Sequence, residues 1–226
     1  TPAAAARAAR DAVDAGASML KYKFADPSHL REVIAAVRGV TRVGIAADAN
    51  GSLSPEEARA VDDLGLVYLE QPLPDGTPWS KLAHLTGSLA TPVCLDESLR
   101  SPDALADAIS TGAIDVASIK ASRMGGVLNA ATAVRLCAAR GIDCFVGGMF
   151  ELGIGRAASL SVAALPGCTQ PTDLGPTERY FEVDLCDPFV TDGNGWVVVP
   201  VGPGIGRTLS EETLQERLVD RVLFAR

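Results

Sequence analysis

Three acidic residues lie at nearly even spacing, and each one ends a short apolar run. Asp48 ends "VGIAAD", Glu70 ends "LVYLE" and Asp96 ends "VCLD". The next apolar run, "DVASIK", ends on Lys120, and the successive steps are 22, 26 and 24 positions. Each step has the length of one strand–helix unit. Carboxylate oxygens are the ligands that Mg²⁺ prefers, and Mn²⁺ accepts the same donors. The spacing therefore predicts a divalent-cation site if these strand ends meet.

A pair of lysines interrupts the apolar run "SMLKYKF", which spans residues 18–24. In a strand, Lys21 and Lys23 point to the same face, because successive side chains alternate. Only four of the 20 basic residues are lysines, and three of these four lie in or at the end of apolar runs. Lysine can give up its proton when it is desolvated or placed near other cations, whereas arginine cannot. An amine beside a divalent cation suits removal of a proton next to a carboxylate, since the cation stabilises the resulting dianion.

Each acidic residue also has a simpler interpretation, as a helix cap or a solvated loop residue. That interpretation suits Asp26 and Asp103, but it fits poorly with three consecutive strand ends flanked by lysine-bearing strands. The sequence contains only two histidines, His29 and His84, and both fall in predicted helices. A zinc site is therefore not expected.

The composition limits the class of protein. The chain has 226 residues, 47% of them hydrophobic, which suits one α/β domain with an aliphatic core. A formal net charge of −8 argues against nucleic acid and anionic membranes as partners, because both favour a basic surface. The sequence predicts neither a membrane-spanning helix nor a signal peptide. Its five cysteines form no CxxC pair and are expected to be reduced core thiols of a cytoplasmic protein.

The elements that must position these residues alternate between strands and helices. Strands are predicted at 18–24, 42–48, 66–70, 92–96, 114–120 and 142–148, with a possible seventh near 169–175. Helices are predicted at 3–15, 26–40, 54–64, 78–86, from 101 onward, 127–140 and 153–165.

Apolar strands joined by helices indicate a parallel sheet, either a doubly wound open sheet or a (β/α) barrel. Neither GxGxxG nor GxxxxGK follows the first strand, which disfavours a nucleotide-binding doubly wound fold. A barrel gathers the carboxyl ends of its strands at one rim, where enzymes of this fold have their active sites. The charged residues at the predicted strand ends therefore favour the barrel.

Five short motifs occur together over most of the chain: "KYK" (21–23), "DAN" (48–50), "EQP" (70–72), "DES" (96–98) and "IKASRMGG" (119–126). In this order they resemble the enolase superfamily, in its muconate-lactonising-enzyme-like branch. The later stretches "GGMFELGIGRAAS" and "VPVGPGIG" look most like o-succinylbenzoate synthases and the related N-succinylamino acid racemases.

The resemblance implies a (β/α) barrel of the enolase-superfamily type. That family normally begins with an α+β capping domain, and the chain is expected to lack both this domain and the first barrel strand. We therefore expect residues 1–175 to form a partial barrel catalytic domain. Residues 176–226 would be a segment that normally returns toward the cap.

The resemblance also implies roles for individual residues. Lys23 would be the general base, Lys120 would face the opposite side of the substrate, and Lys21 would assist Lys23. The Mg²⁺ ligands would be the three strand-end acids, Asp48, Glu70 and Asp96. Substrate contacts at the rim would come from Asn50, Arg123, Gly147, Gly148 and Met149. Arg123 has an equally plausible interpretation as a surface or helix-capping residue. Glu97 is expected to support Lys21 or Lys120 from behind.

The implied function is that of a Mg²⁺-dependent o-succinylbenzoate synthase, a hydro-lyase of menaquinone biosynthesis acting on a small-molecule carboxylate. Racemisation of N-succinylamino acids, dipeptide epimerisation and muconate cycloisomerisation remain alternatives, because the same residues serve all of them. A further alternative from a different class is an inactive or truncated barrel. The motifs leave the oligomeric state open.

Overall fold

The structure is a computed structural model, and it describes residues 1–24, 26–220 and 222. The strands of the described chain are β1 Met19–Lys23, β2 Gly44–Asp48, β3 Leu69–Glu70, β4 Val93–Leu95, β5 Val116–Ile119 and β6 Asp143–Val146. The α-helices are α1 Pro2–Asp14, α2 Pro27–Arg38, α3 Pro55–Ala60, α4 Trp79–Thr86, α5 Pro102–Thr111, α6 Val127–Arg140, α7 Gly153–Ala163 and α8 Glu211–Arg217. Two short 3₁₀ helices, η1 Asp62–Leu64 and η2 Thr177–Arg179, complete the regular structure.

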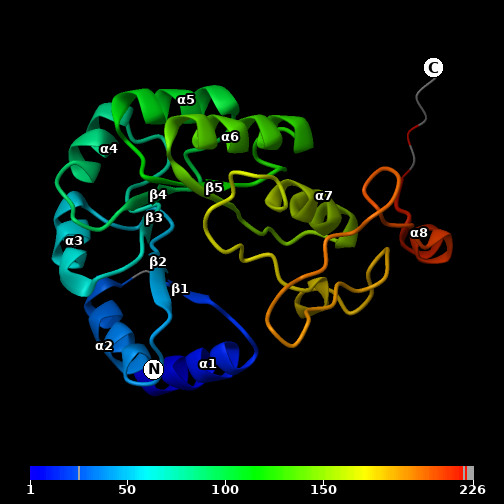
Figure 1. Cartoon of the computed structure of the whole chain (residues 1–226), viewed down its shortest axis with the longest axis horizontal. Coiled ribbons are helices and arrows are strands. Elements are labelled where there is room, and N and C mark those ends of the chain that lie inside the picture. The colour runs from blue at the N-terminus through cyan, green and yellow to red at the C-terminus, as the bar shows by residue number, and fades with distance from the viewer. Residues whose placement is uncertain (25, 221, 223–226) are drawn as a thin grey trace.

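The sheet is parallel throughout, and its spatial order is β1-β2-β3-β4-β5-β6. A doubly wound sheet reverses its strand order at a switch point, and this sheet does not. The strands curl into a half-barrel, and the helices that connect them cover its outer side (Figure 1). The predicted (β/α) barrel is confirmed, and the nucleotide-binding doubly wound alternative is wrong.

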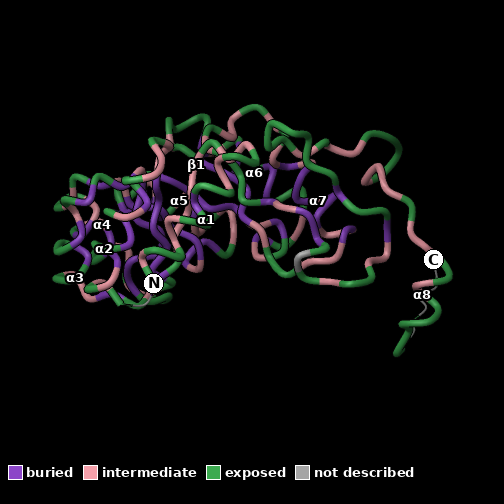
Figure 2. The backbone as a smooth tube through the Cα atoms, turned by 90° about the horizontal axis from the view of Figure 1, so that it is seen from below, coloured by how far each residue is buried: buried purple, intermediate pink, exposed green. Residues whose placement is uncertain are grey.

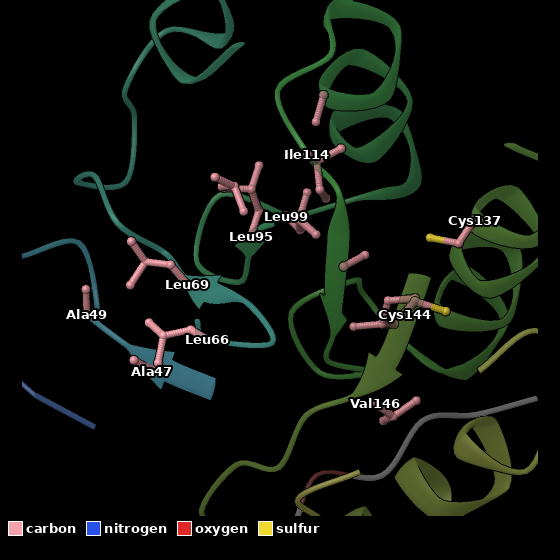
Figure 3. Packing of buried hydrophobic residues seen from close by; sticks show 14 of the residues in the cluster. Ala47, Ala49, Leu66, Leu69, Leu95, Leu99, Ile114, Cys137, Cys144 and Val146 are labelled. Carbon is pink, nitrogen blue, oxygen red and sulfur yellow. The ribbon is translucent and has the colours of Figure 1, made fainter. Parts of the chain in front are cut away.

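Side chains that alternate between the two faces of the strands pack into two separate hydrophobic cores. The larger core lies between sheet and helices and takes Leu69, Leu95 and Val146 from the strands (Figure 3). The smaller one lines the concave face and contains Ala46, Tyr68, Cys94, Val116 and Phe145. Burial is concentrated in the sheet and the inner faces of the helices, whereas α8 has no buried residue (Figure 2). The concave face is therefore the side on which charged strand-end residues can meet.

Local sequence signals explain where several helices begin. Ser54 accepts a hydrogen bond from the backbone of Glu57, whose side chain accepts one from the backbone of Ser54, with Pro55 at the first helical position. The predicted start of a helix at residue 54 is confirmed. The helix itself ends at Ala60, earlier than expected, and the chain continues through η1. Within the described residues, no helix has the length and apolar character needed to cross a bilayer.

The possible seventh strand near 169–175 is wrong. The backbone amides of Thr169 and Gln170 both donate to the Cys144 carbonyl, and the Thr172 hydroxyl donates to the Val146 carbonyl. Pro171 has no N–H to continue such a ladder. The segment therefore runs beside β6 without becoming a strand, and it leads to Asp173.

The C-terminal segment folds back onto the first part of the chain. A turn at Asn194 and Gly195 approaches Gly16 so closely that a Cβ added to Gly16 would lie 2.3 Å from the Asn194 carbonyl carbon. Both glycines have positive φ, +96° and +80°, which residues with side chains rarely adopt. The domain boundary at residues 175 and 176 stays a prediction.

Candidate functional site

The carboxyl ends of five neighbouring strands place the predicted site residues along one rim. Lys23 lies opposite Asp48 in the β1–β2 register, and Asp48 lies opposite Glu70 in the β2–β3 register. Asp96 directly follows β4, and Lys120 directly follows β5. The order around the rim is therefore lysine, three acids, lysine.

Lys21 is the more buried member of the lysine pair, with 21% of its side chain exposed. Its ammonium lies 2.9 Å from Glu70 Oε2 and 2.8 Å from Asp173 Oδ2. Burial alone would lower the pKa of Lys21, but the two carboxylates outweigh it and raise the pKa well above its ordinary value. The ammonium also lies 5.3 Å from the ring centroid of Phe145, within reach of a cation–π contact. Lys21 is therefore a fixed positive charge.

Lys23 is placed differently, although it shares the same face. Its side chain is 70% exposed, and its ammonium lies 3.9 Å from Asp48 Oδ2. Because Lys23 makes only this loose ion pair among the contacts that the structure describes, it can turn toward a substrate at the rim. The structure thus separates a buried, doubly paired lysine from an accessible one.

On the opposite flank, Asp96 pairs with two cations. Its Oδ2 lies 2.7 Å from the Lys120 ammonium, and its Oδ1 accepts a very short hydrogen bond from the Arg123 guanidinium. Gln71 holds the backbone beside this pair, since its Oε1 accepts from the amides of Asp96 and Ser98 at 3.0 and 3.3 Å. Gln71 itself has a φ of +38°, which is uncommon for a residue other than glycine.

Two further predicted residues contact each other. The Asn50 side-chain amide donates to Glu97 Oε1 at 2.9 Å, and the Asn50 backbone donates to Asp48 Oδ1 at 2.9 Å. Glu97 was expected to support Lys21 or Lys120, but the structure gives it Asn50 as its partner instead. Asn50 has a φ of +44°, so the chain turns sharply just after Asp48. Asn50 therefore links Glu97 to Asp48, the first residue of the acidic row.

The glycine pair after β6 leaves room for charged neighbours. A Cβ on Gly147 would lie 2.9 Å from Lys120 Cε, and one on Gly148 would lie 3.0 Å from Arg156 Nη1. The Gly148 amide donates to Asp173 Oδ1 at 2.6 Å. Met149, the third rim residue expected to contact substrate, has an exposed side chain. These two glycines therefore leave space for neighbouring side chains, and neither has the positive φ that would require glycine for its backbone conformation.

Four residues near the mouth were not predicted as site residues. Asp173 and Gln71 contact predicted residues directly. Arg156 is buried next to Gly148, and Glu151 Oε1 lies 3.6 Å from its Nε. For Gln71, its place directly after a strand-end acid was the available signal. Asp173 follows a segment without strand periodicity, so only its position one βα unit after β6 could have indicated it.

The acidic row has the chemistry of a divalent-cation site without its closed geometry. Among the described residues, no three acidic, histidine or cysteine side chains converge closely enough to hold a metal ion. Each acid instead faces a basic or amide group. Glu70 Oε1, however, is buried and has no hydrogen-bond partner, and Asp48 lies beside it. An unpartnered buried carboxylate oxygen amid other hard oxygen donors fits Mg²⁺.

The crowding of acids has a measurable consequence for stability. Burial, together with repulsion from Asp48 and Asp96, raises the pKa of Glu70 from 4.5 to about 7, although Lys21 opposes the shift. The folded state then binds a proton that the unfolded state releases, so the contribution of Glu70 is complete below about pH 4.5 and is lost as the pH rises through about 7.

We expect Glu70→Gln to flatten the decline in unfolding free energy between these pH values. The measurement is urea unfolding of the metal-free protein at a series of pH values. Glu216→Gln, at an exposed position of α8, is the control and should leave the slope unchanged. An unchanged slope for Glu70→Gln would contradict the raised pKa.

Fold and rim together define a (β/α)-barrel domain with an acid–lysine mouth. Residues 4–213 match the family described as enolase C-terminal domain-like. The chain belongs to this family, which confirms the resemblance to the enolase superfamily.

Curated relatives show which enzymes the chain is similar to. An N-succinylamino acid racemase from an Amycolatopsis species is 40% identical over 212 residues, covering 90% of this chain and 56% of the relative. An o-succinylbenzoate synthase from Geobacillus stearothermophilus is 38% identical, covering 84% of this chain and 52% of the relative. The chain thus spans about half the length of these curated relatives.

Solved structures agree with the fold. A probable mandelate racemase from Alicyclobacillus acidocaldarius has a TM-score of 0.89 and 38% identity, covering 97% of this chain and 58% of that one. An L-Ala-D/L-Glu epimerase from Bacillus subtilis has a TM-score of 0.79 and 26% identity, covering 89% of this chain and 58% of that one. These relatives are named as racemases, synthases and epimerases, so the homologues are enzymes, and their names do not separate lyase from racemase for this chain.

Proposed function

We propose that the protein removes a proton from the carbon next to a carboxylate of a small-molecule substrate, in a Mg²⁺-dependent reaction. The observation that carries the proposal is the order of the rim residues: an accessible lysine, three buried acids and a second lysine on consecutive strand ends. Asp48, Glu70 and Asp96 would hold the cation. When bound, Mg²⁺ would supply positive charge for the enediolate formed on the substrate.

The preferred reaction is that of an o-succinylbenzoate synthase. Lys23 takes the α-proton of a hydroxy-cyclohexadiene carboxylate, and the protonated Lys23 then returns a proton to the leaving hydroxyl group. Lys120, on the opposite flank, contributes positive charge to the face of the ring. Lys21, paired with Glu70 and Asp173, stays protonated and places a fixed charge beside Lys23. Because the α-carbon is not reprotonated and Lys23 passes its proton to the leaving hydroxyl group, one base suffices for this reaction.

Racemisation of N-succinylamino acids is the second candidate. It is favoured by the 40% identical relative that carries this name and by the two lysines on opposite flanks of the acidic row. In a racemase, Lys23 and Lys120 would each exchange a proton with one face of the α-carbon. Dipeptide epimerisation and cycloisomerisation use the same residues, and a cytoplasmic location suits all of these reactions.

Incubation in D₂O separates the two candidates. The synthase predicts rapid formation of the aromatic product, followed by absorbance, and slow deuterium uptake into N-succinylphenylalanine, followed by NMR. Both enantiomers of the amino acid derivative are tested, and an inactive Lys23→Arg sample controls for spontaneous exchange. A higher kcat/KM for exchange and inversion than for aromatisation would replace the synthase with the racemase.

A further inference from the structure

Asp173 is the second carboxylate, besides Glu70, that pairs with the Lys21 ammonium. The two carboxylates are 2.8 and 2.9 Å from the same nitrogen, although Glu70 comes from the middle of the sheet and Asp173 from beside its last strand, opposite the β1 edge that carries Lys21. Glu70 ends β3, whereas Asp173 follows the segment that runs beside β6. The Lys21–Asp173 pair is thus a bridge between the two edges of the half-barrel.

The backbone fixes Asp173 independently of Lys21. Asp173 Oδ1 accepts a 2.6 Å hydrogen bond from the Gly148 amide, which leaves Oδ2 for the ammonium. The preceding residues are held by the Cys144 and Val146 carbonyls. Because these contacts come from the sheet, Asp173 stays in place whether or not Lys21 moves.

Glu70 is both a partner of Lys21 and a proposed ligand of the divalent cation. Its Oε2 is taken by Lys21, and its Oε1 is buried without a partner. A cation that binds Glu70 competes with the Lys21 ammonium for the same carboxylate, and it repels that ammonium. Asp173 offers the displaced ammonium a counter-charge at essentially its present position, so Lys21 need not be left unpaired in a buried site.

We propose that Asp173 is a positioning residue that takes over Lys21 from Glu70 when a divalent cation binds, and that it thereby sets the affinity of the acidic row for that cation. The inference rests on the proposed metal site but not on which reaction the site performs. It gives a role to the segment beside β6, which contains none of the predicted metal ligands.

The test is calorimetric titration of MgCl₂ into the metal-free full chain. Asp173→Asn should raise the Kd for Mg²⁺ about ten- to hundredfold, the usual range for residues that orient metal ligands. Asp173→Glu keeps the charge and should recover most of the affinity. Circular dichroism and thermal melting establish that each variant is folded.

A double-mutant comparison separates positioning from simple charge. If Asp173 acts through Lys21, the effect of Asp173→Asn should largely disappear in a Lys21→Met background. An equal or larger effect in that background would overturn the inference, because it would show that Asp173 acts on the cation directly. An unchanged Kd for Asp173→Asn in the otherwise native chain would also overturn it.

Two outcomes distinguish this inference from the proposed function. If the native chain binds no Mg²⁺, both fall together; if it binds Mg²⁺ and Asp173→Asn does not weaken binding, only the inference falls. Should Asp173→Asn fail to fold, Lys21→Met alone remains decisive. Removal of the competing ammonium should leave Mg²⁺ binding at least as tight as in the native chain, and weaker binding would count against the exchange of partners.

Discussion

Replacement of Lys23 by arginine is expected to lower kcat by about a hundred- to ten-thousandfold, the range typical of losing a general base. Arginine keeps the positive charge beside Asp48, but its guanidinium does not give up a proton at any useful pH. The exposed position of Lys23 allows the larger head group to fit without unfolding the barrel. The loss should therefore appear in kcat, with little change in the melting temperature.

The matched control for this prediction is Lys81→Arg. This substitution makes the same chemical change at an exposed position of α4, on the outer side of the half-barrel (Figure 1). Steady-state assays with the cyclohexadiene carboxylate and with N-succinylphenylalanine measure both candidate reactions. Retained turnover by Lys23→Arg in either assay would remove Lys23 from the role of base in that reaction.

Removal of divalent cations is expected to reduce turnover to the uncatalysed background. Without a cation, the substrate carboxylate would meet three buried acids, and the enediolate dianion would lose the divalent counter-charge between it and them. Excess EDTA should abolish activity, and Mg²⁺ added beyond the chelator should restore it; Mn²⁺ should restore it in part or in full. Activity that survives exhaustive chelation would refute the metal role of the acidic row.

Thermal melting supplies a second measurement of the same site. Mg²⁺ should raise the melting temperature of the native chain in a concentration-dependent way, because it binds the folded state. Asp48→Asn is the informative variant, since among the described residues the Asp48 side chain meets the loosely paired Lys23 ammonium and the Asn50 backbone amide. It should remove most of the Mg²⁺-dependent shift. Sodium chloride at matched ionic strength controls for general screening.

The sequence predicted the row of acids because each acid ends a short, continuous apolar run. The carboxyl ends of parallel strands lie at one edge of the sheet. Residues one strand–helix unit apart in the sequence, such as Asp48, Glu70 and Asp96, therefore lie next to one another in the structure. The parallel sheet and the barrel could be predicted from the same spacing, whereas an incomplete barrel was implied by the family resemblance. Helix starts such as the one at Ser54 depend on equally local signals and were predicted correctly.

Partners from distant segments could not be predicted in this way. Asp173 reaches Lys21 across the open sheet, from a segment in which Pro171 breaks the strand pattern. The pairing of Glu97 with Asn50 depends on a left-handed turn that no periodicity reports. Spacing fixes which strand end a residue occupies, whereas loop conformation decides which neighbour its side chain meets.

The left-handed turns at Asn50 and Gln71 restrict which residues can occupy these positions. A left-handed backbone costs a residue with a side chain about 1–2 kcal/mol relative to its preferred conformation. Glycine would avoid that cost, but it would lose the amide bonds from Asn50 to Glu97 and from Gln71 to Ser98. A β-branched residue would lose those bonds and resist the turn as well. Two uncharged amides, neither of which exchanges a proton, therefore limit how far the mouth can be redesigned for another substrate.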